Sequence, residues 1–288
     1  MKYWFGLVTI IVLLNISCST GRSAGYQRIV DAISADSSVK LKTQIRAISN
    51  DSFTAHQLYA AGVLINYRLL KPAEINSGRL YPLVLILHSS GTPVGTDNTS
   101  QLTVLAKCWA QPFIRSGYPA FIVAPQFPSR TSDYTMDSAR QVLVSVPHPQ
   151  LAATGWLIDS LKKTLPVDPA RIYVMGFSMG GSSTVNAMQL RPDLFAAGVS
   201  ISGIPSFNSM EEMARMPLWL IHGNADTENP IASDRLYYKA MKARKNKNLL
   251  FWEINGLEHD LYYKLYTTGL IPAWLFRHKK RAAAIHTP

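Results

Sequence analysis

Three residue types that suit nucleophilic catalysis follow one another along the chain, each close behind an apolar segment. The segment Arg171–Met175 leads into Gly-Phe-Ser-Met-Gly, whose serine is Ser178. Asp226 and then His259 come after two later apolar segments. A serine hydroxyl is a weak nucleophile until a histidine takes its proton, and that histidine needs an acidic residue to orient its ring. We therefore predict that Ser178 is the nucleophile, His259 the base and Asp226 the residue that orients the base.

The glycines on either side of Ser178 predict a sharp turn between a strand and a helix. Side chains at these positions would obstruct so tight a turn, and the following helix directs its amino end at the serine. The backbone N–H of Met179 is then free to stabilise an oxyanion. A second donor is expected from the loop after the apolar segment Leu83–Leu87. We favour the amide of Ser90 and leave that of Ser89 open.

Other acidic residues and histidines near these positions are weaker candidates. Glu228 and Asp234 lie further along the loop or on a predicted helix. Glu258 and Asp260 are immediate neighbours of the predicted base, where the chain geometry rarely lets a carboxylate orient the ring. His222 ends an apolar segment and is expected to be structural.

Short apolar segments alternate with helix-like segments along most of the chain. Nearly continuous apolarity over four to six residues is typical of strands buried on both faces. Their alternation with helices indicates parallel pairing, and so a mostly parallel, doubly wound α/β sheet with helices on both faces. Such a sheet carries its sites at the carboxyl ends of the strands. The expected strands are a hairpin of 57–59 with 63–70, then 83–87, 120–123, 171–175, 197–201, 218–221 and 249–254; the expected helices are 101–116, 150–164, 181–191, 206–215, 233–245 and 260–276.

Two connecting segments bear on the shape of the site. The predicted strands 197–201 and 218–221 both follow the serine, and the connection between them is essentially residues 204–216. So few residues cannot build a separate lid domain. The segment 127–150 shows no strand pattern and is expected to form a wall of the pocket.

The amino terminus has the features of an export signal. The apolar run Tyr3–Leu14 is too short for a membrane-spanning helix, which needs about 20 residues, but it suits a signal peptide. A small residue and Cys18 follow, which resembles a bacterial lipoprotein signal, although Asn15 stands where an aliphatic residue is usual. We predict a signal peptide over 1–17, lipid attachment at Cys18 and a polar spacer over 18–50. A plain cleaved signal is the alternative.

The overall charge is strongly positive, at +11, with basic clusters near 242–247 and 277–281. No nucleic-acid-binding module accompanies them, so we interpret them as a solvated helix face and a basic tail, with no nucleic acid as partner. The cysteines are Cys18 and Cys108. If Cys18 carries lipid, no disulfide can form within the chain, and Cys108 is expected to be a buried apolar residue. No clustered ligand set indicates a metal, and no cofactor is expected.

Recognisable motifs lie at Tyr81–His88, Gly95–Asn98, Tyr118–Gln126, Arg171–Gly181, Pro192–Ala197, His222–Asp226 and Gly256–Asp260. Together they resemble the predicted-peptidase or phospholipase/carboxylesterase-like branch of the α/β-hydrolases, which is related to dienelactone hydrolase. The resemblance covers roughly residues 55–278 and implies an α/β-hydrolase domain over 51–280, followed by a tail over 281–288. Members of this branch include carboxylesterases, feruloyl and acetyl xylan esterases, and prolyl-oligopeptidase-like enzymes. The resemblance therefore implies a small-molecule or oligosaccharide ester as substrate.

These observations predict an exported serine hydrolase that cleaves carboxylic esters through an acyl-enzyme and is held by lipid at a bacterial membrane, on its periplasmic or outer-membrane face. A serine peptidase is the alternative, because the triad does not separate esters from amides. A prolyl oligopeptidase would usually carry a propeller domain, for which 288 residues leave no room. A surface glycan-binding protein on a retired hydrolase scaffold is the alternative of another class. The intact triad counts against it.

Overall fold

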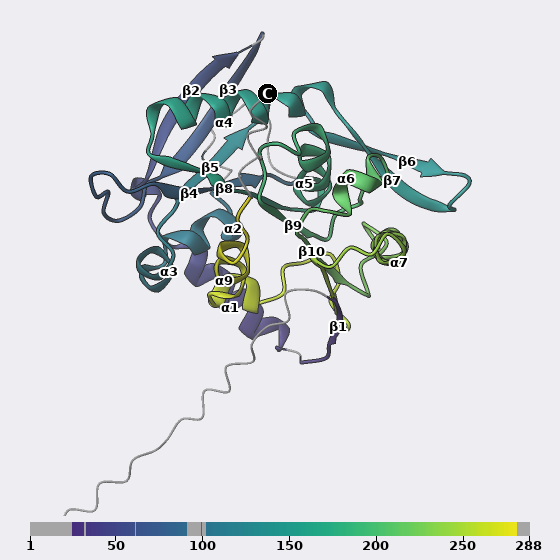
Figure 1. The fold of residues 1–288 in the computed structure, drawn as a ribbon. Helices are drawn as coiled ribbons and strands as arrows, with labels where there is room; N and C mark the ends of the chain where they lie inside the picture. Colours follow the sequence, from purple (N-terminus) through teal and green to yellow (C-terminus); the bar gives the residue numbers. More distant parts are fainter. Residues whose placement is uncertain (1–24, 32, 61, 91–98, 100–101, 281–288) are drawn as a thin grey trace, which may run out of the picture.

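The centre of the computed structural model is a nine-stranded sheet (Figure 1). The structure describes residues 25–31, 33–60, 62–90, 99 and 102–280. The strands of this sheet are β1 (Gly25–Ile29), β2 (Phe53–Ala60), β3 (Val63–Leu70), β4 (Tyr81–Leu87), β5 (Phe121–Gln126), β8 (Val167–Phe177), β9 (Ala197–Ile201), β10 (Leu218–Gly223) and β11 (Leu249–Ile254). They lie in the order β1-β11-β10-β9-β8-β4-β5-β3-β2, and only the pairs β2–β3 and β3–β5 are antiparallel. The prediction of a mostly parallel, doubly wound sheet is confirmed.

Two groups of helices cover the two faces of this sheet (Figure 1). On one face lie α4 (Ala153–Thr164), α5 (Met179–Leu190), α6 (Met210–Met213) and α7 (Ala232–Ala243). On the other lie α1 (Ala35–Arg46), α2 (Val104–Lys107), α3 (Pro112–Gly117), α8 (Lys264–Thr267) and α9 (Leu270–Phe276). Single 3₁₀ turns are formed by η1 (Asn50–Ser52), η3 (Cys108–Ala110) and η4 (Pro149–Ala152).

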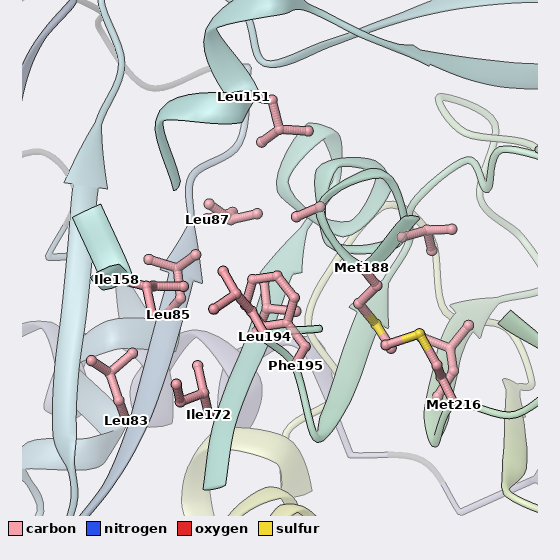
Figure 2. Close-up of a cluster of buried hydrophobic side chains, with 14 of the residues drawn as sticks. Leu83, Leu85, Leu87, Leu151, Ile158, Ile172, Met188, Leu194, Phe195 and Met216 are labelled. Atoms are coloured by element: carbon pink, nitrogen blue, oxygen red, sulfur yellow. The ribbon is translucent and has the colours of Figure 1, made fainter. Parts of the chain in front are cut away.

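The strand β4 shows why the central strands read as unbroken apolar segments. Leu83, Leu85 and Leu87 belong to the cluster under α4 and α5, which Figure 2 shows in part. Val84 and Ile86, between them in sequence, belong to the cluster on the opposite face. Successive side chains of a strand point to opposite faces, so a strand covered on both faces needs an apolar residue at every position. Burial of each such side chain stabilises the fold by roughly 1.5–3 kcal/mol.

The predicted polar spacer is wrong for residues 25–50, which belong to the domain. Strand β1 pairs in parallel with β11, and α1 packs on the face that carries α9. The ammonium of Lys107 donates to the carbonyl oxygens of Arg46, at 2.7 Å, and Ile48, at 2.6 Å, and so ties the end of α1 to α2. An edge strand alternates partly buried with exposed residues, which makes its sequence look polar.

The segment 127–150 also differs from its prediction, because it contains an antiparallel hairpin of β6 (Ser132–Asp137) and β7 (Val142–Pro147). Hydroxyl contacts hold the hairpin on α5: Ser183 lies 2.7 Å from Thr131 and 2.8 Å from Ser132, measured between their side-chain oxygens. The amide of Asn186 donates to the Ser132 hydroxyl at 2.9 Å. The strand β7 reads Val-Leu-Val-Ser-Val-Pro, so the sequence contains a strand signal in this segment that the prediction overlooks.

Two predicted helices are interrupted. The helix expected over 101–116 is divided into α2, η3 and α3, because Pro112 lacks an N–H and begins a new helix. The helix expected over 260–276 begins only at Lys264 and is divided near Gly269. Between β9 and β10 the chain forms only α6, so no lid domain is inserted there, as predicted.

The predicted signal peptide over 1–17, the lipidated Cys18 and the tail over 281–288 lie outside the described residues. Among the helices that the structure does describe, none combines the length and apolarity needed to cross a membrane. Cys108, by contrast, is described and buried, as expected, and burial raises the pKa of its thiol to about 12.

Candidate active site

Ser178 lies at the turn between β8 and α5, at the carboxyl edge of the sheet. Its backbone has φ 58° and ψ −123°, an unusual conformation that costs a non-glycine residue of order 1–3 kcal/mol and is typical of functional sites. A Cβ at Gly176 would lie 2.4 Å from the backbone of Gly180, and one at Gly180 would lie 2.1 Å from the Leu87 carbonyl oxygen. Both glycines are therefore required by close backbone approach, as the motif predicts.

The ring of His259, in the loop after β11, lies between Ser178 and Asp226. Its Nε2 is 2.8 Å from the Ser178 Oγ, and its Nδ1 is 2.7 Å from the Asp226 Oδ2. A carboxylate can only accept, so Nδ1 carries the proton and Nε2 accepts from the serine hydroxyl. The Phe177 ring packs against the imidazole, with centroids 4.8 Å apart. The histidine is thus held in the tautomer and position that a general base needs.

Asp226 is buried and accepts hydrogen bonds on both carboxylate oxygens. Its Oδ1 accepts from the backbone N–H groups of Glu228, at 3.0 Å, and Asn229, at 2.8 Å. Its Oδ2 faces His259 and also the Nε2 of His222, at 3.2 Å. Burial alone would raise the pKa of Asp226, but the hydrogen bonds from His222, Asn229 and His259 outweigh burial and lower it to about 2. The carboxylate is therefore ionised at neutral pH and can stabilise an imidazolium.

Other carboxylates near His259 are placed differently. The Glu228 Oε2 lies 3.7 Å from the histidine Nε2, on the side of the serine, and its side chain is largely exposed. Asp260 forms an ion pair with Lys42 of α1. The carboxylate that the structure places at the histidine Nδ1 is that of Asp226.

The loop after β4 lies against the serine turn, and a buried histidine shapes it. The Nδ1–H of His88 donates to the carbonyl oxygen of Ser89 at 3.0 Å, and its Nε2 accepts from the N–H of Phe127 at 3.3 Å. Burial lowers the pKa of His88, which keeps the ring in the neutral form that can donate once and accept once. Met179 is the first residue of α5, opposite this loop. Ser89 and Ser90, the two candidate donors of the second amide, both follow His88 in this loop.

A second buried histidine, His222, lies behind Asp226. Its Nδ1 is 2.8 Å from the Asp234 Oδ2, and its Nε2 is 2.7 Å from the Asn229 carbonyl oxygen. Burial alone would lower the pKa of His222, but its hydrogen bonds to Asp226 and Asp234 raise it to about 9. The sequence predicts a structural role for this histidine and does not reveal its contact with Asp226. One feature of the sequence could have indicated this contact: His222 stands at the end of a predicted strand and is followed closely by Asp226 and Asp234.

A cavity of about 190 Å³ lies beside the loop that carries His259. Phe177, which packs on the His259 ring, forms one of its walls, and apolar side chains of β4 and α2 form others. Charged side chains also line it: Lys42 and Arg46 of α1, and Asp260, which is the ion-pair partner of Lys42. Lys42 and Arg46 were not predicted to lie near the site, because α1 falls in the segment predicted to be a polar spacer.

The part of the chain that the structure describes contains no group of three or more histidine, cysteine or carboxylate side chains placed to hold a metal ion. The ring nitrogens of His222 and His259 contact oxygen atoms of the chain instead. The arrangement suits proton transfer to and from the serine oxygen.

Comparisons with known proteins give several matches. The sequence model of the prolyl oligopeptidase family matches residues 150–215, which include the serine turn. A solved thermostable esterase is 32% identical, with a TM-score of 0.71 over 80% of this chain and 64% of the esterase. A bifunctional acetylxylan esterase/xylanase of Neocallimastix patriciarum is 36% identical over 76 residues, which are 25% of this chain and 11% of that protein. Cutinase 2 of Thermobifida cellulosilytica is 31% identical over 112 residues, or 38% of this chain and 41% of the cutinase. The chain thus spans less than half of each of these two curated relatives.

Proposed function

We propose that this chain, which belongs to the α/β-hydrolase superfamily, is a serine hydrolase that cleaves carboxylic esters through an acyl-enzyme. The observation that carries the proposal is the unbroken hydrogen-bonded series Ser178, His259 and Asp226. A serine next to a neutral histidine, whose other nitrogen contacts an ionised carboxylate, can lose its proton as it attacks.

Acylation begins when the Ser178 Oγ attacks the ester carbonyl carbon and passes its proton to the His259 Nε2. The new C–O bond produces a tetrahedral oxyanion, which we assign to the backbone amides of Met179 and Ser90. The oxyanion then collapses, the bond to the alcohol breaks, and the histidine returns the proton to the departing alcohol oxygen. Asp226 stabilises the imidazolium while the histidine holds that proton.

Deacylation repeats the same steps with water. His259 takes a proton from a water molecule, whose oxygen attacks the acyl carbon of the acyl-enzyme. Collapse releases the carboxylic acid and returns the proton to the Ser178 oxygen. No proton or electron remains unbalanced over the cycle, so the reaction needs only ester and water.

Ester substrates are supported by the relatives and by the cavity. An acetylxylan esterase, a cutinase and a thermostable esterase are among the similar proteins. The cavity beside His259 has apolar side chains on one part of its lining and charged ones on another, and its small volume suits a small acyl or alcohol group rather than a polymer chain inside the protein. We therefore propose esters of small acids, including acetyl or feruloyl esters of oligosaccharides, as the substrate class.

A serine peptidase is the second candidate, because the prolyl oligopeptidase model matches the segment that contains the serine turn. The same series of proton transfers cleaves amides, whose leaving amine must be protonated by His259 before it departs. Matched pairs of substrates with one acyl group on p-nitrophenol or on p-nitroaniline would separate the two activities.

We further propose that the protein is exported and held by lipid on Cys18, in a bacterial cell envelope. The apolar run Tyr3–Leu14, followed shortly by this cysteine, supports the proposal. Cys108 is buried, so within the described residues no exposed thiol competes for modification or for a disulfide. A lipid-held hydrolase would act on substrates at the cell surface or in the periplasm.

The experiment that tests the activity uses the wild type and Ser178→Ala. A fluorophosphonate probe should label the wild type and leave the variant unlabelled. The wild type should then hydrolyse members of a panel of p-nitrophenyl acetate and butyrate, acetylated and feruloylated oligosaccharides, and aminoacyl anilides. A folded wild type that neither takes the label nor hydrolyses any of these would overturn the proposal and favour a glycan-binding role.

A further inference from the structure

We propose that His222 and Asp234 are positioning residues for Asp226, and that a proton shared between them keeps the protonated Nε2 of His222 facing the Asp226 Oδ2, beside the Nδ1 of His259. The inference rests on the proposed serine hydrolase function. It adds two buried residues to the catalytic arrangement without placing either in contact with substrate.

The hydrogen-bond partners determine where the protons of His222 lie. Its Nε2 faces the Asn229 carbonyl oxygen at 2.7 Å and the Asp226 Oδ2 at 3.2 Å, and both of these atoms can only accept. The Nε2 therefore carries a proton. The Nδ1 faces the Asp234 Oδ2 at 2.8 Å, so a second proton lies between these two atoms. We place this proton on the ring, so that the His222 imidazolium and the Asp234 carboxylate form a pair that is neutral overall.

The burial of both side chains favours this neutral pair. Neither side chain is exposed to solvent, and an unbalanced buried charge would be expensive. Burial raises the pKa of Asp234, while the contacts with Asp226 and Asp234 outweigh burial and raise that of His222. Both shifts keep the shared proton in place at neutral pH.

The other titratable groups around this pair come from α7 and β11. Tyr237 of α7 is fully buried, and burial followed by the charge of Asp234 raises the pKa of its hydroxyl far above the neutral range. Arg235 of α7 forms an ion pair with Glu253, which is the partner of His222 in the β10–β11 register. Tyr237, Arg235 and Glu253 keep their charge states between pH 5 and 8. One further ionisable group, His259 in the loop after β11, contacts the same Asp226 oxygen as His222, so the titration must be followed at the ring nitrogens of His222 itself.

The pair completes the set of donors around Asp226. Two backbone amides donate to its Oδ1, and two imidazole rings face its Oδ2. Asn229 links the two sides, because its N–H donates to Asp226 and its carbonyl accepts from His222. Its side-chain amide also donates to the Ser202 carbonyl oxygen at 2.7 Å. Because both carboxylate oxygens of Asp226 have two partners each, the carboxylate is held against rotation. Such restraint matters because catalytic side chains must be held to within roughly 0.5 Å of their working positions.

The kinetic test compares His222→Leu, His222→Gln and Asp234→Asn on p-nitrophenyl acetate. His222→Leu should lower kcat by about 10- to 100-fold, the range found when hydrogen-bond partners behind catalytic or metal-binding side chains are removed, with KM changed little. His222→Gln keeps an N–H donor and should recover most of the loss. Asp234→Asn can donate its NH₂ group to a bare Nδ1 and leave the Nε2 proton in place, so it should lower kcat less than His222→Leu does.

A matched control separates positioning from general stability. Asp168 is another buried carboxylate, held by Arg171 at 2.6 Å, near the amino end of β8 and so at the opposite end of the sheet from the serine. Asp168→Asn should lower the melting temperature and leave kcat unchanged. If His222→Leu is folded and keeps the wild-type kcat, or if His222→Gln loses as much kcat as His222→Leu, the positioning role is refuted.

A spectroscopic test on the wild type does not depend on any variant being active. With ¹⁵N-labelled histidine, both ring nitrogens of His222 should have the shifts of protonated nitrogens from pH 5.5 to 8, and the His222→Gln spectrum identifies them by difference. In Asp234→Asn the same ring should titrate within this range. A bare nitrogen on His222 of the wild type at pH 7 would overturn the proton sharing. A wild type that shows both protonated nitrogens but has no esterase activity would refute the proposed function and leave the proton sharing intact.

Discussion

Replacing Asp226 with asparagine tests how the site holds its base. The amide has one accepting oxygen where the carboxylate has two. If this oxygen stays with the backbone N–H groups of Glu228 and Asn229, the NH₂ group faces His259 and donates to its Nδ1. The ring must then carry its proton on Nε2, which points at Ser178 and can no longer accept the hydroxyl proton.

We expect Asp226→Asn to lower kcat by about 10⁴, the loss caused by a histidine held in the wrong tautomer, which is roughly 5–6 kcal/mol in the barrier. The opposite orientation of the amide would leave two buried backbone donors unpaired, at about 1–3 kcal/mol each, so the structure favours the first. Ser178→Ala and His259→Ala should each lower kcat by a factor on the order of 10⁶.

The assay is steady-state hydrolysis of p-nitrophenyl acetate at pH 7.5, well below the melting temperature of the variant. Glu228→Gln is the control, because its exposed carboxylate lies on the serine side of His259 and not at Nδ1. It should change kcat only mildly. If Asp226→Asn loses less than tenfold, or if Glu228→Gln loses more than Asp226→Asn, then Asp226 does not orient the base.

Gly180→Ala should destabilise the protein by more than about 2 kcal/mol in urea unfolding, because its Cβ would meet the Leu87 carbonyl oxygen at 2.1 Å, whereas Gly117→Ala, with open space around it, should be nearly neutral. Cys18→Ser should abolish incorporation of labelled fatty acid and move the protein from the membrane to the soluble fraction; an unlabelled, soluble wild type would contradict the anchor. The pKa of His222 is raised to about 9 in the folded protein from about 6.5 in the unfolded chain, so its stabilising effect is complete below pH 6.5 and disappears as pH rises through 9. Thermal unfolding of wild type and His222→Gln between pH 6 and 9.5 should therefore converge as pH rises; parallel curves would argue against a raised pKa.

The central sheet and the serine turn could be predicted from the sequence because the physical demands on them are local. A strand covered on both faces needs an apolar residue at each position, as β4 shows, and the serine turn needs glycine wherever another backbone comes close. The carboxyl ends of parallel strands lie along one edge of the sheet. Residues just beyond β8, β10 and β11 could therefore be expected to meet, although the sequence does not give the distances between them.

The features that could not be predicted depend on partners far away in sequence. Strand β1 alternates partly buried and exposed residues and finds its partner, β11, at the other end of the chain. The position of the β6–β7 hairpin on α5 is set by hydroxyl groups rather than by an apolar face. The contact between His222 and Asp226 depends on the turn that places the Asn229 carbonyl oxygen under the ring, and composition does not reveal that turn.

The pairing of β1 with β11 also determines when the fold can be completed. Gly25 pairs with Leu250 and Ile29 with Ile254, so the first strand of the sheet needs the last one as its template. At roughly 5–20 residues per second, the ribosome takes about 10–45 s to make the chain between them. Contacts over such separations form late, because a long loop must first be closed. Strand β1 therefore stays unpaired until β11 has been made, and this edge of the sheet closes only after the whole domain has emerged.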